Sequence, residues 1–98
     1  MTIEIVKNND ETIIEVAGRL DTITAPALDS SINECAEYTT NLILDLKNLV
    51  YISSAGLRVI LSAQKKMQKI GSMKVINVCE EIMGIFEMTG FADILVIE

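Results

Sequence analysis

The chain has 98 residues, half of them hydrophobic, and a formal net charge of −6 at pH 7. This length predicts a single domain over residues 1–98, and the hydrophobic content is enough for a packed core without disulfides or metal. The acidic balance argues against nucleic acid or an anionic membrane as the main ligand, because both reward lysine and arginine.

The types of residue that are present exclude several kinds of site. The sequence has no histidine and two cysteines, Cys35 and Cys79, which lie far apart and form no C-x-x-C pair. A Ser-His-Asp triad and zinc sites built from cysteine and histidine are therefore excluded within one chain. We expect no catalytic residue, no metal and no cofactor, and two packed thiols in a reducing compartment.

The chain also lacks the marks of membrane insertion or export. No apolar run approaches the roughly 18 residues of a membrane span. The N-terminal sequence MTIEIVKNND is polar and alternating, unlike a signal peptide. These observations predict a cytoplasmic protein without a membrane partner.

The first part of the chain predicts a β-hairpin followed by a helix. The segments 2–7 (TIEIVK) and 12–18 (TIIEVAG) alternate apolar and polar residues on either side of the turn-forming sequence NNDE. Thr24 suits a helix N-cap, and Pro26 suits a first helical turn. Apolar residues then recur with helical spacing at Leu28, Ile32, Cys35 and Ala36.

The rest of the chain alternates strands and helices. The run NLILDL is compact and apolar, so we expect a strand buried on both faces, as in a parallel sheet. The run LVYI (49–52) follows it after Lys47-Asn48. The further expected elements are a helix from Gly56 to the stop at Gly71, the strand 73–78, the helix 80–90 and a closing strand 93–98. The order β-β-α-β-α-β-α-β predicts an α/β fold with a mixed, mostly parallel β-sheet, whose first strand pairs antiparallel.

The segment 51–58, YISSAGLR, lies where the apolar run changes to the helical pattern. In open sheets of this kind, functional groups gather outside the carboxyl ends of parallel strands. The structural interpretation is that Ser53 or Ser54 caps the helix by accepting a hydrogen bond from a free backbone N–H group. Ala55 and Gly56 are then small so that the helix and the sheet can approach closely.

Three functional interpretations compete with the cap. A nucleophile elbow needs G-x-S-x-G, but Ile52 stands where the first glycine belongs and histidine is absent. No P-loop or G-x-G-x-x-G pattern occurs, so only a generic helix N-terminus remains to hold an anion. Phosphorylation at a helix start is chemically sensible, because the helix dipole favours a phosphate there while the added charge disfavours a docked partner.

Three segments of the chain carry specific motifs in order: VAGRLDTITAP (16–26), LILDLKNLVYISSAGLRVIL (42–61) and IMGIFEMTGFADILVI (82–97). The second resembles the signature segment of STAS domains, specifically of bacterial anti-sigma factor antagonists, in which an apolar strand leads to D-S-[STA]-G-L and an apolar helix. The first resembles the family's G-x-L-D followed by a Thr/Ala-rich helix start, and the third resembles its C-terminal apolar segment. The resemblance covers essentially the whole chain.

The resemblance implies the STAS fold and a partner-switching function. In the family, the unphosphorylated antagonist binds an anti-sigma factor, usually a GHKL-type serine kinase, and so frees a sigma factor for transcription. The kinase phosphorylates the serine of D-S-[STA]-G-L and the complex dissociates, after which a PP2C-type phosphatase restores the active form. The expected partners are therefore such a kinase and such a phosphatase.

The resemblance also implies which residues act. Alignment on the Gly-Leu pair places Ser54 at the phosphorylated serine, while Ser53 stands where the family has aspartate and becomes an alternate acceptor. Asp21 matches the acid near the partner surface, although aspartate is equally common in a turn before a helix. The expected partner-binding residues are Asp21, Thr22, Thr24, Ser53, Ser54, Gly56 and Arg58.

Other residues have expected roles that do not depend on the partner. Arg58 is expected to pair with an acidic partner, to pair with a phosphate on Ser54, or to be simply solvated. Asp45 is expected to satisfy backbone N–H groups of the following loop, and Gly18 and Gly56 to allow close approach or an unusual φ. Four methionines are expected to pack in the core or at its rim: Met67, Met73, Met83 and Met88.

Two other functions remain open at this point. A constitutive, unphosphorylated STAS scaffold, for example in a transport system, is favoured by the missing acid at Ser53. Nucleotide binding or hydrolysis by the domain itself is the third possibility, but the sequence supplies no base, metal cluster or phosphate loop for it.

Overall fold

The computed structural model describes all residues, Met1–Glu98. Five strands and three helices confirm the expected α/β class. They are β1 (Thr2–Asn8), β2 (Glu11–Leu20), α1 (Ala25–Cys35), β3 (Asn41–Asp45), β4 (Leu49–Ile52), α2 (Ser54–Ile70), β5 (Ser72–Ile76) and α3 (Glu80–Thr89), followed by a short 3₁₀ turn, η1 (Phe91–Asp93).

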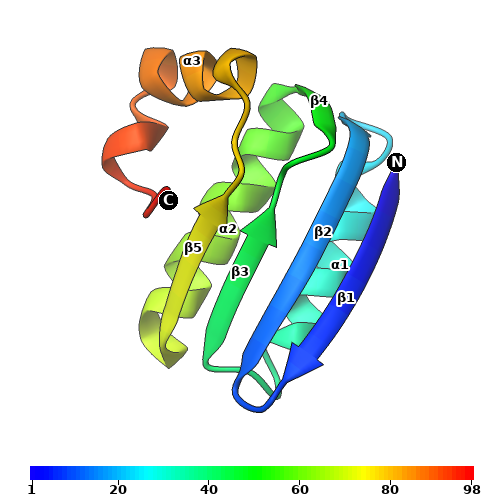
Figure 1. The fold of residues 1–98 in the computed structure, drawn as a ribbon, viewed down its shortest axis with the longest axis vertical. Helices are drawn as coiled ribbons and strands as arrows, with labels where there is room; N and C mark the ends of the chain where they lie inside the picture. Colours follow the sequence, from blue (N-terminus) through cyan, green and yellow to red (C-terminus); the bar gives the residue numbers. More distant parts are fainter.

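The sheet is mixed and mostly parallel (Figure 1). The strands lie in the order β1-β2-β3-β5, and β4 pairs with β2 beyond the end of β3. Only the pair β1–β2 is antiparallel, as expected for an N-terminal hairpin, while β2–β3, β2–β4 and β3–β5 are parallel. The run that follows α1 therefore forms two strands, β3 and β4, which both pair with the long strand β2.

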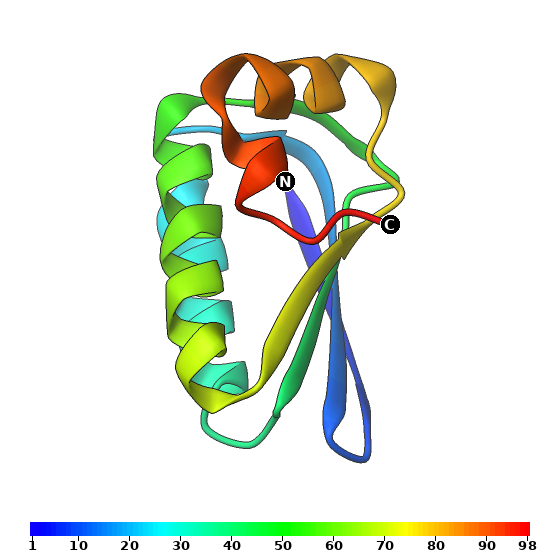
Figure 2. The ribbon, with the colours of Figure 1, turned by 90° about the vertical axis from the view of Figure 1, so that its left-hand side faces the viewer.

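The helices α1 and α2 cover one face of the sheet, and α3 lies across the end where β4 finishes (Figure 2). Alternate residues of β2, such as Ile14 and Val16, point into a core of 20 buried residues beneath the two helices. Burial of each such side chain contributes about 1.5–3 kcal/mol relative to exposure. The opposite face of the sheet has no helix over it. Ile43 and Asp45 on that face are nevertheless buried, with only 6% and 8% of their surface exposed. The expectation that the strand 41–46 is buried on both faces is confirmed.

The long helix α2 forms because its apolar residues recur on one side. Ile60, Ala63 and Met67 are buried at helical spacing, and the helix ends where Gly71 meets the neighbouring loop. A Cβ on Gly71 would lie 2.0 Å from the Thr40 carbonyl oxygen, so only glycine fits at this stop. None of the helices combines the length and the apolar content that a membrane-spanning segment needs.

The C-terminal segment differs from the expected strand 93–98. Phe91 stacks on the buried Phe86 with ring centroids 6.5 Å apart, and the Leu95 N–H donates to the Phe91 carbonyl. The chain therefore forms η1. Packing Phe91 and Leu95 against the core stabilises the protein more than a regular strand at the edge of the sheet would. Only a single parallel bridge, Val75 to Ile97, remains from the expected pairing.

Candidate functional site

The carboxyl ends of β2 and β4 meet at the upper end of the sheet in Figure 1. Leu20 and Ile52 are register partners there, and the Ser53 N–H donates to the Leu20 carbonyl at 2.9 Å. This pairing brings the loop after β2 beside the turn before α2. The segments 16–26 and 42–61 thus converge on one site.

Ser53 is the N-cap of α2. Its backbone is extended (φ −97°, ψ 175°), and its Oγ accepts a hydrogen bond from the Gly56 N–H at 3.3 Å. The Leu57 N–H donates to the Ser53 carbonyl at 2.9 Å, which closes the first turn. The structural interpretation of one serine as a cap is therefore confirmed, and Ser53 is that serine.

Ser54 is the first residue of α2 and lies exposed to solvent. Its hydroxyl takes part in none of the side-chain hydrogen bonds of the structure, which at this turn join Ser53 and Gly56. The two adjacent serines therefore have different chemical positions. One hydroxyl holds the helix start, and the other is free and accessible.

Gly56 allows α2 to lie directly on the strand ends. A Cβ at this position would come within 2.7 Å of Leu20 Cγ and 2.9 Å of Ile52 Cγ1, closer than side chains tolerate. The expectation that Gly56 serves close approach is confirmed. Because Gly56 is buried, its effect on the site is to hold Ser53 and Ser54 in place.

Asp21 organises the neighbouring loop. Its Oδ1 accepts hydrogen bonds from the N–H groups of Ile23 and Thr24, both at 3.0 Å, in the manner of an Asx turn. The hydrogen bond from the Thr24 backbone N–H lowers the pKa of the Asp21 carboxyl, and the nearby Arg19 guanidinium acts in the same direction. The carboxylate form of Asp21 therefore stabilises this turn.

Thr24 occupies the N-cap position of α1, but its side chain does not cap that helix. The Thr24 Oγ1 accepts from the Asp21 N–H and donates to the Arg19 carbonyl, each at 2.8 Å. The expected helix cap is thus replaced by hydrogen bonds that close the loop, since the Thr24 hydroxyl is engaged by the Asp21 N–H and the Arg19 carbonyl. Thr22 is exposed beside it, so the loop presents Thr22 while Thr24 supports it from within.

Arg19 and Tyr51 also belong to this site, although neither was expected there from the sequence. The register of β2 and β4 shifts between Gly18 and Arg19, where Gly18 has a φ of +92°, and Arg19 then pairs with Tyr51. The Arg19 guanidinium lies 4.0 Å from the centre of the Tyr51 ring, and its Nε lies 3.9 Å from Asp21 Oδ2. Such pairing depends on strand register, which no local pattern of residues reveals.

Two apolar residues stand out by their exposure to solvent. Ile23 in the loop after β2 and Met88 on α3 are each 88% exposed. Ile23 was detectable in the sequence as a lone apolar residue in a polar loop, whereas Met88 was expected to pack in the core or at its rim. Single exposed apolar side chains are common, and Ile23 is the one that lies in the loop between Asp21 and Thr24.

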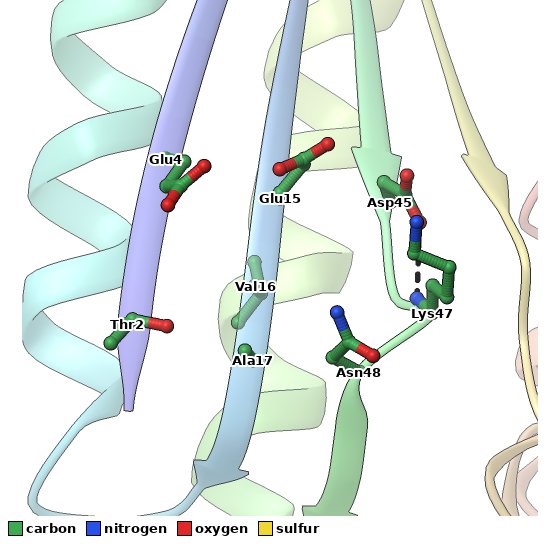
Figure 3. A pocket seen from close by; sticks show the side chains of 8 residues that line it. All are labelled: Thr2, Glu4, Glu15, Val16, Ala17, Asp45, Lys47 and Asn48. Atoms are coloured by element: carbon green, nitrogen blue, oxygen red, sulfur yellow. Dashed lines mark hydrogen bonds between the residues drawn. The ribbon is translucent and has the colours of Figure 1, made fainter.

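A hollow of about 170 Å³ lies elsewhere, on the open face of the sheet (Figure 3). Glu4, Glu15 and Asp45 line it, and none of the expected site residues does. Asp45 Oδ1 accepts from the Lys47 N–H at 3.0 Å and from the Asn77 side chain at 3.1 Å, which confirms its expected role in the following loop. No group of acidic or cysteine residues in the structure could hold a metal ion.

The family model described as "STAS domain" matches residues 2–98. The chain belongs to the STAS domain family. An anti-sigma-B factor antagonist of Bacillus subtilis (strain 168) is 31% identical over 96 residues, which cover 97% of this chain and 88% of that protein. The anti-sigma-B factor antagonist of Listeria monocytogenes is 30% identical over 95 residues, covering 94% of this chain and 82% of the relative.

Solved structures show that the STAS fold extends over nearly the whole chain. An anti-sigma factor antagonist from Mycobacterium paratuberculosis superposes with a TM-score of 0.89 at 23% identity, covering 98% of this chain and 83% of that one. The anti-sigma factor antagonist SpoIIAA in its unphosphorylated form gives a TM-score of 0.80 at 15% identity, covering 99% and 87%. A sulfate transporter family protein from Wolinella succinogenes also gives 0.80, at 21% identity, covering 94% and 80%. At these identities the STAS fold is what the proteins share.

Proposed function

We propose that this STAS protein is a single-domain anti-sigma factor antagonist controlled by phosphorylation of Ser54. Unphosphorylated, it binds an anti-sigma factor at the surface formed by the loop after β2 and the start of α2. When phosphorylated, it releases that partner. The sigma factor is then no longer freed from the anti-sigma factor, so sigma-factor-dependent transcription falls. The relatives named anti-sigma-B factor antagonists, similar along nearly the full chain, support this role.

The observation that supports the switch is the free, exposed hydroxyl of Ser54 at the first position of α2. A phosphate there gains from the helix dipole, so the domain stays folded after modification. A partner docked over the same position would have to bury an added charge of about −1.5 to −2. Phosphorylation therefore acts on binding with little effect on the fold.

Ser53 is the weaker acceptor in this proposal. Its Oγ holds the Gly56 N–H, and transfer of phosphate to Ser53 would require that cap to rearrange. Replacement of an N-cap serine costs about 1 kcal/mol of stability. A kinase that reaches this turn thus finds the hydroxyl of Ser54 ready and that of Ser53 occupied.

The proposed partners follow from this assignment. We infer an anti-sigma factor of the GHKL serine-kinase type, a PP2C-type phosphatase that reverses the modification, and a cytoplasmic setting in which all three meet. The protein itself is a binding protein and not an enzyme, since the proposal gives catalysis to the kinase and the phosphatase. Asp21, Thr22, Arg58 and the two serines provide its polar contacts.

A phosphorylation assay tests the proposal. The protein is incubated with its cognate anti-sigma factor and ATP, and the modified residue is located by mass spectrometry. We expect phosphate on Ser54, none in a Ser54→Ala variant, and continued modification of Ser54 in a Ser53→Ala variant. Absence of phosphate from both serines in the presence of an active kinase contradicts the switch.

A second function retains one supporting observation. Ser53 replaces the aspartate that precedes the phosphorylated serine in the family pattern, and this departure favours an unphosphorylated scaffold subunit, for example of a transport system. Affinity purification from the native cell separates the two possibilities. Recovery of a kinase and a phosphatase supports the switch, and recovery of transporter subunits supports the scaffold.

A further inference from the structure

The helix α2 has a charge pattern that the proposed function does not yet explain. It contains four cations, Arg58, Lys65, Lys66 and Lys69, and no acidic residue, in a chain whose net charge is −6. Arg58, Lys65 and Lys69 follow Ser54 at positions i+4, i+11 and i+15, which share one side of an α-helix. All of them are exposed. Ser54 therefore stands at the N-terminal end of a basic stripe.

Arg58 is the member of this stripe nearest to Ser54, and it lies where a cation is unfavourable. It belongs to the first two turns of α2, near the positive end of the helix dipole. The ion pairs of the structure join Arg19 with Asp21 and Lys74 with Glu98, so Arg58 has no carboxylate partner. The guanidinium of Arg58 is thus exposed, has no carboxylate partner and lies one helical turn from the free hydroxyl of Ser54. This arrangement favours the binding of an anion at Ser54.

We infer that Arg58 is the residue that binds the phosphate of phosphorylated Ser54, a step that rests on the proposed function. Side chains at i and i+4 of a helix are neighbours, with Cβ atoms about 5–6 Å apart. A phosphate on Ser54 extends that side chain toward Arg58, whose planar guanidinium donates to phosphate oxygens in a bidentate manner. The pair forms on the surface of α2 without movement of its backbone.

The other cations near the site are less suited to this contact. Arg19 already stacks on Tyr51 and lies beside Asp21. Lys65 is on the same side of α2 but about 16 Å farther along the axis, at 1.5 Å of rise per residue, beyond the Debye length of about 8–10 Å. Arg58 is consequently the cation of α2 that a phosphate on Ser54 can reach.

This pairing makes the modification act on binding in two ways. The phosphate adds an anion at the partner surface, and it also engages a guanidinium that was free to donate to an acidic group of the partner. Both effects disfavour the complex. The pairing also offsets part of the added charge within the protein, so the phosphorylated form keeps a stable helix start.

The experiment uses protein in which phosphoserine is incorporated at position 54 during translation, so that no kinase is required. Phosphorus NMR then follows the second ionisation of the phosphate as a function of pH. A neighbouring cation favours the dianion. We therefore expect the second pKa of the phosphate to be lower in the wild type than in Arg58→Gln, by at least about half a unit. Arg58→Lys should fall between them, and the matched control Lys65→Gln should titrate as the wild type does.

A second readout is the NMR signal of the Arg58 Nε–H group, which should shift on phosphorylation in the wild type and remain shifted in Lys65→Gln. Identical phosphate titrations in the wild type and Arg58→Gln, with an unmoved Arg58 signal, overturn the pairing. Failure of the kinase to modify Ser54 is a separate result that overturns the proposed function. The two hypotheses are therefore tested independently.

Discussion

The backbone N–H of Ser53 donates a hydrogen bond to the carbonyl oxygen of Leu20 at 2.9 Å. This one contact joins the end of β2 to the turn that starts α2, across two segments that are distant in the sequence. The loop containing Asp21 and the free hydroxyl of Ser54 are therefore held on the same surface. A partner that binds one of them meets the other.

Charge at Ser54 should control partner binding. Ser54→Asp is expected to weaken the complex with the anti-sigma factor by about 2–5 kcal/mol, because it places a negative charge in the buried interface. Ser54→Ala should bind constitutively, even after treatment with kinase and ATP. Titration calorimetry with the purified partner measures both effects.

The matched control for this prediction is Ser62→Asp. Ser62 is exposed on the same side of α2, about two turns farther from the site, and the substitution adds the same charge there. We expect nearly unchanged binding. Equal weakening by both substitutions would instead indicate a general effect of negative charge on α2.

The cap at Ser53 should contribute measurably to stability. Ser53→Ala removes the acceptor of the Gly56 N–H and is expected to lower the free energy of unfolding by about 1 kcal/mol. Ser53→Asp restores an acceptor and places a negative charge at the helix N-terminus, so it should retain or exceed wild-type stability. Urea denaturation compares the variants, and an unchanged midpoint in Ser53→Ala contradicts the capping role.

The two glycines Gly56 and Gly84 should respond to alanine in opposite directions. A Cβ at Gly56 meets Leu20 and Ile52 at less than 3 Å, so Gly56→Ala is expected to cost about 1–3 kcal/mol through overpacking. Nothing lies within 4 Å of a Cβ at Gly84, in the middle of α3, so Gly84→Ala should stabilise by about 0.5–1 kcal/mol. Thermal unfolding of the wild type and the two alanine variants measures both effects. Equal changes in melting temperature for Gly56→Ala and Gly84→Ala would contradict the close approach at Gly56.

The turn at Asp21 should make stability depend on pH. Hydrogen bonds from the Thr24 and Ile23 N–H groups lower the pKa of Asp21 below its ordinary 3.8 in the folded protein. A depressed folded pKa adds stability above the unfolded pKa, and this contribution is lost as the pH falls through the folded pKa. The advantage of the wild type over Asp21→Asn should therefore be full at pH 6 and shrink below pH 4.

The melting temperatures of the wild type and Asp21→Asn, measured from pH 2.5 to pH 7, test this dependence. Asp21→Ala serves as the comparison, because it removes the acceptor of the turn at every pH. A constant difference between the wild type and Asp21→Asn across the range would show that ionisation of Asp21 does not stabilise the turn.

The sequence by itself determined the elements whose signals are local. Alternation identified the hairpin of β1 and β2, and helical spacing identified α1, α2 and α3, because one buried face imposes its period on neighbouring residues. The junction before α2 was also evident, since an apolar run ends there at two serines and a glycine. The motifs around Asp21 and Ser54 indicated the family, which the match over residues 2–98 confirmed.

Only the tertiary structure decided how these local elements meet. The division into β3 and β4, the stacking of Arg19 on Tyr51 and the turn that replaces the last strand all depend on contacts between distant segments. The roles of the two serines were decided in the same way. Gly56 allows α2 to pack closely against Leu20 and Ile52, and this close approach sets where the helix starts. The hydroxyl of Ser53 therefore forms the cap, and that of Ser54 faces solvent.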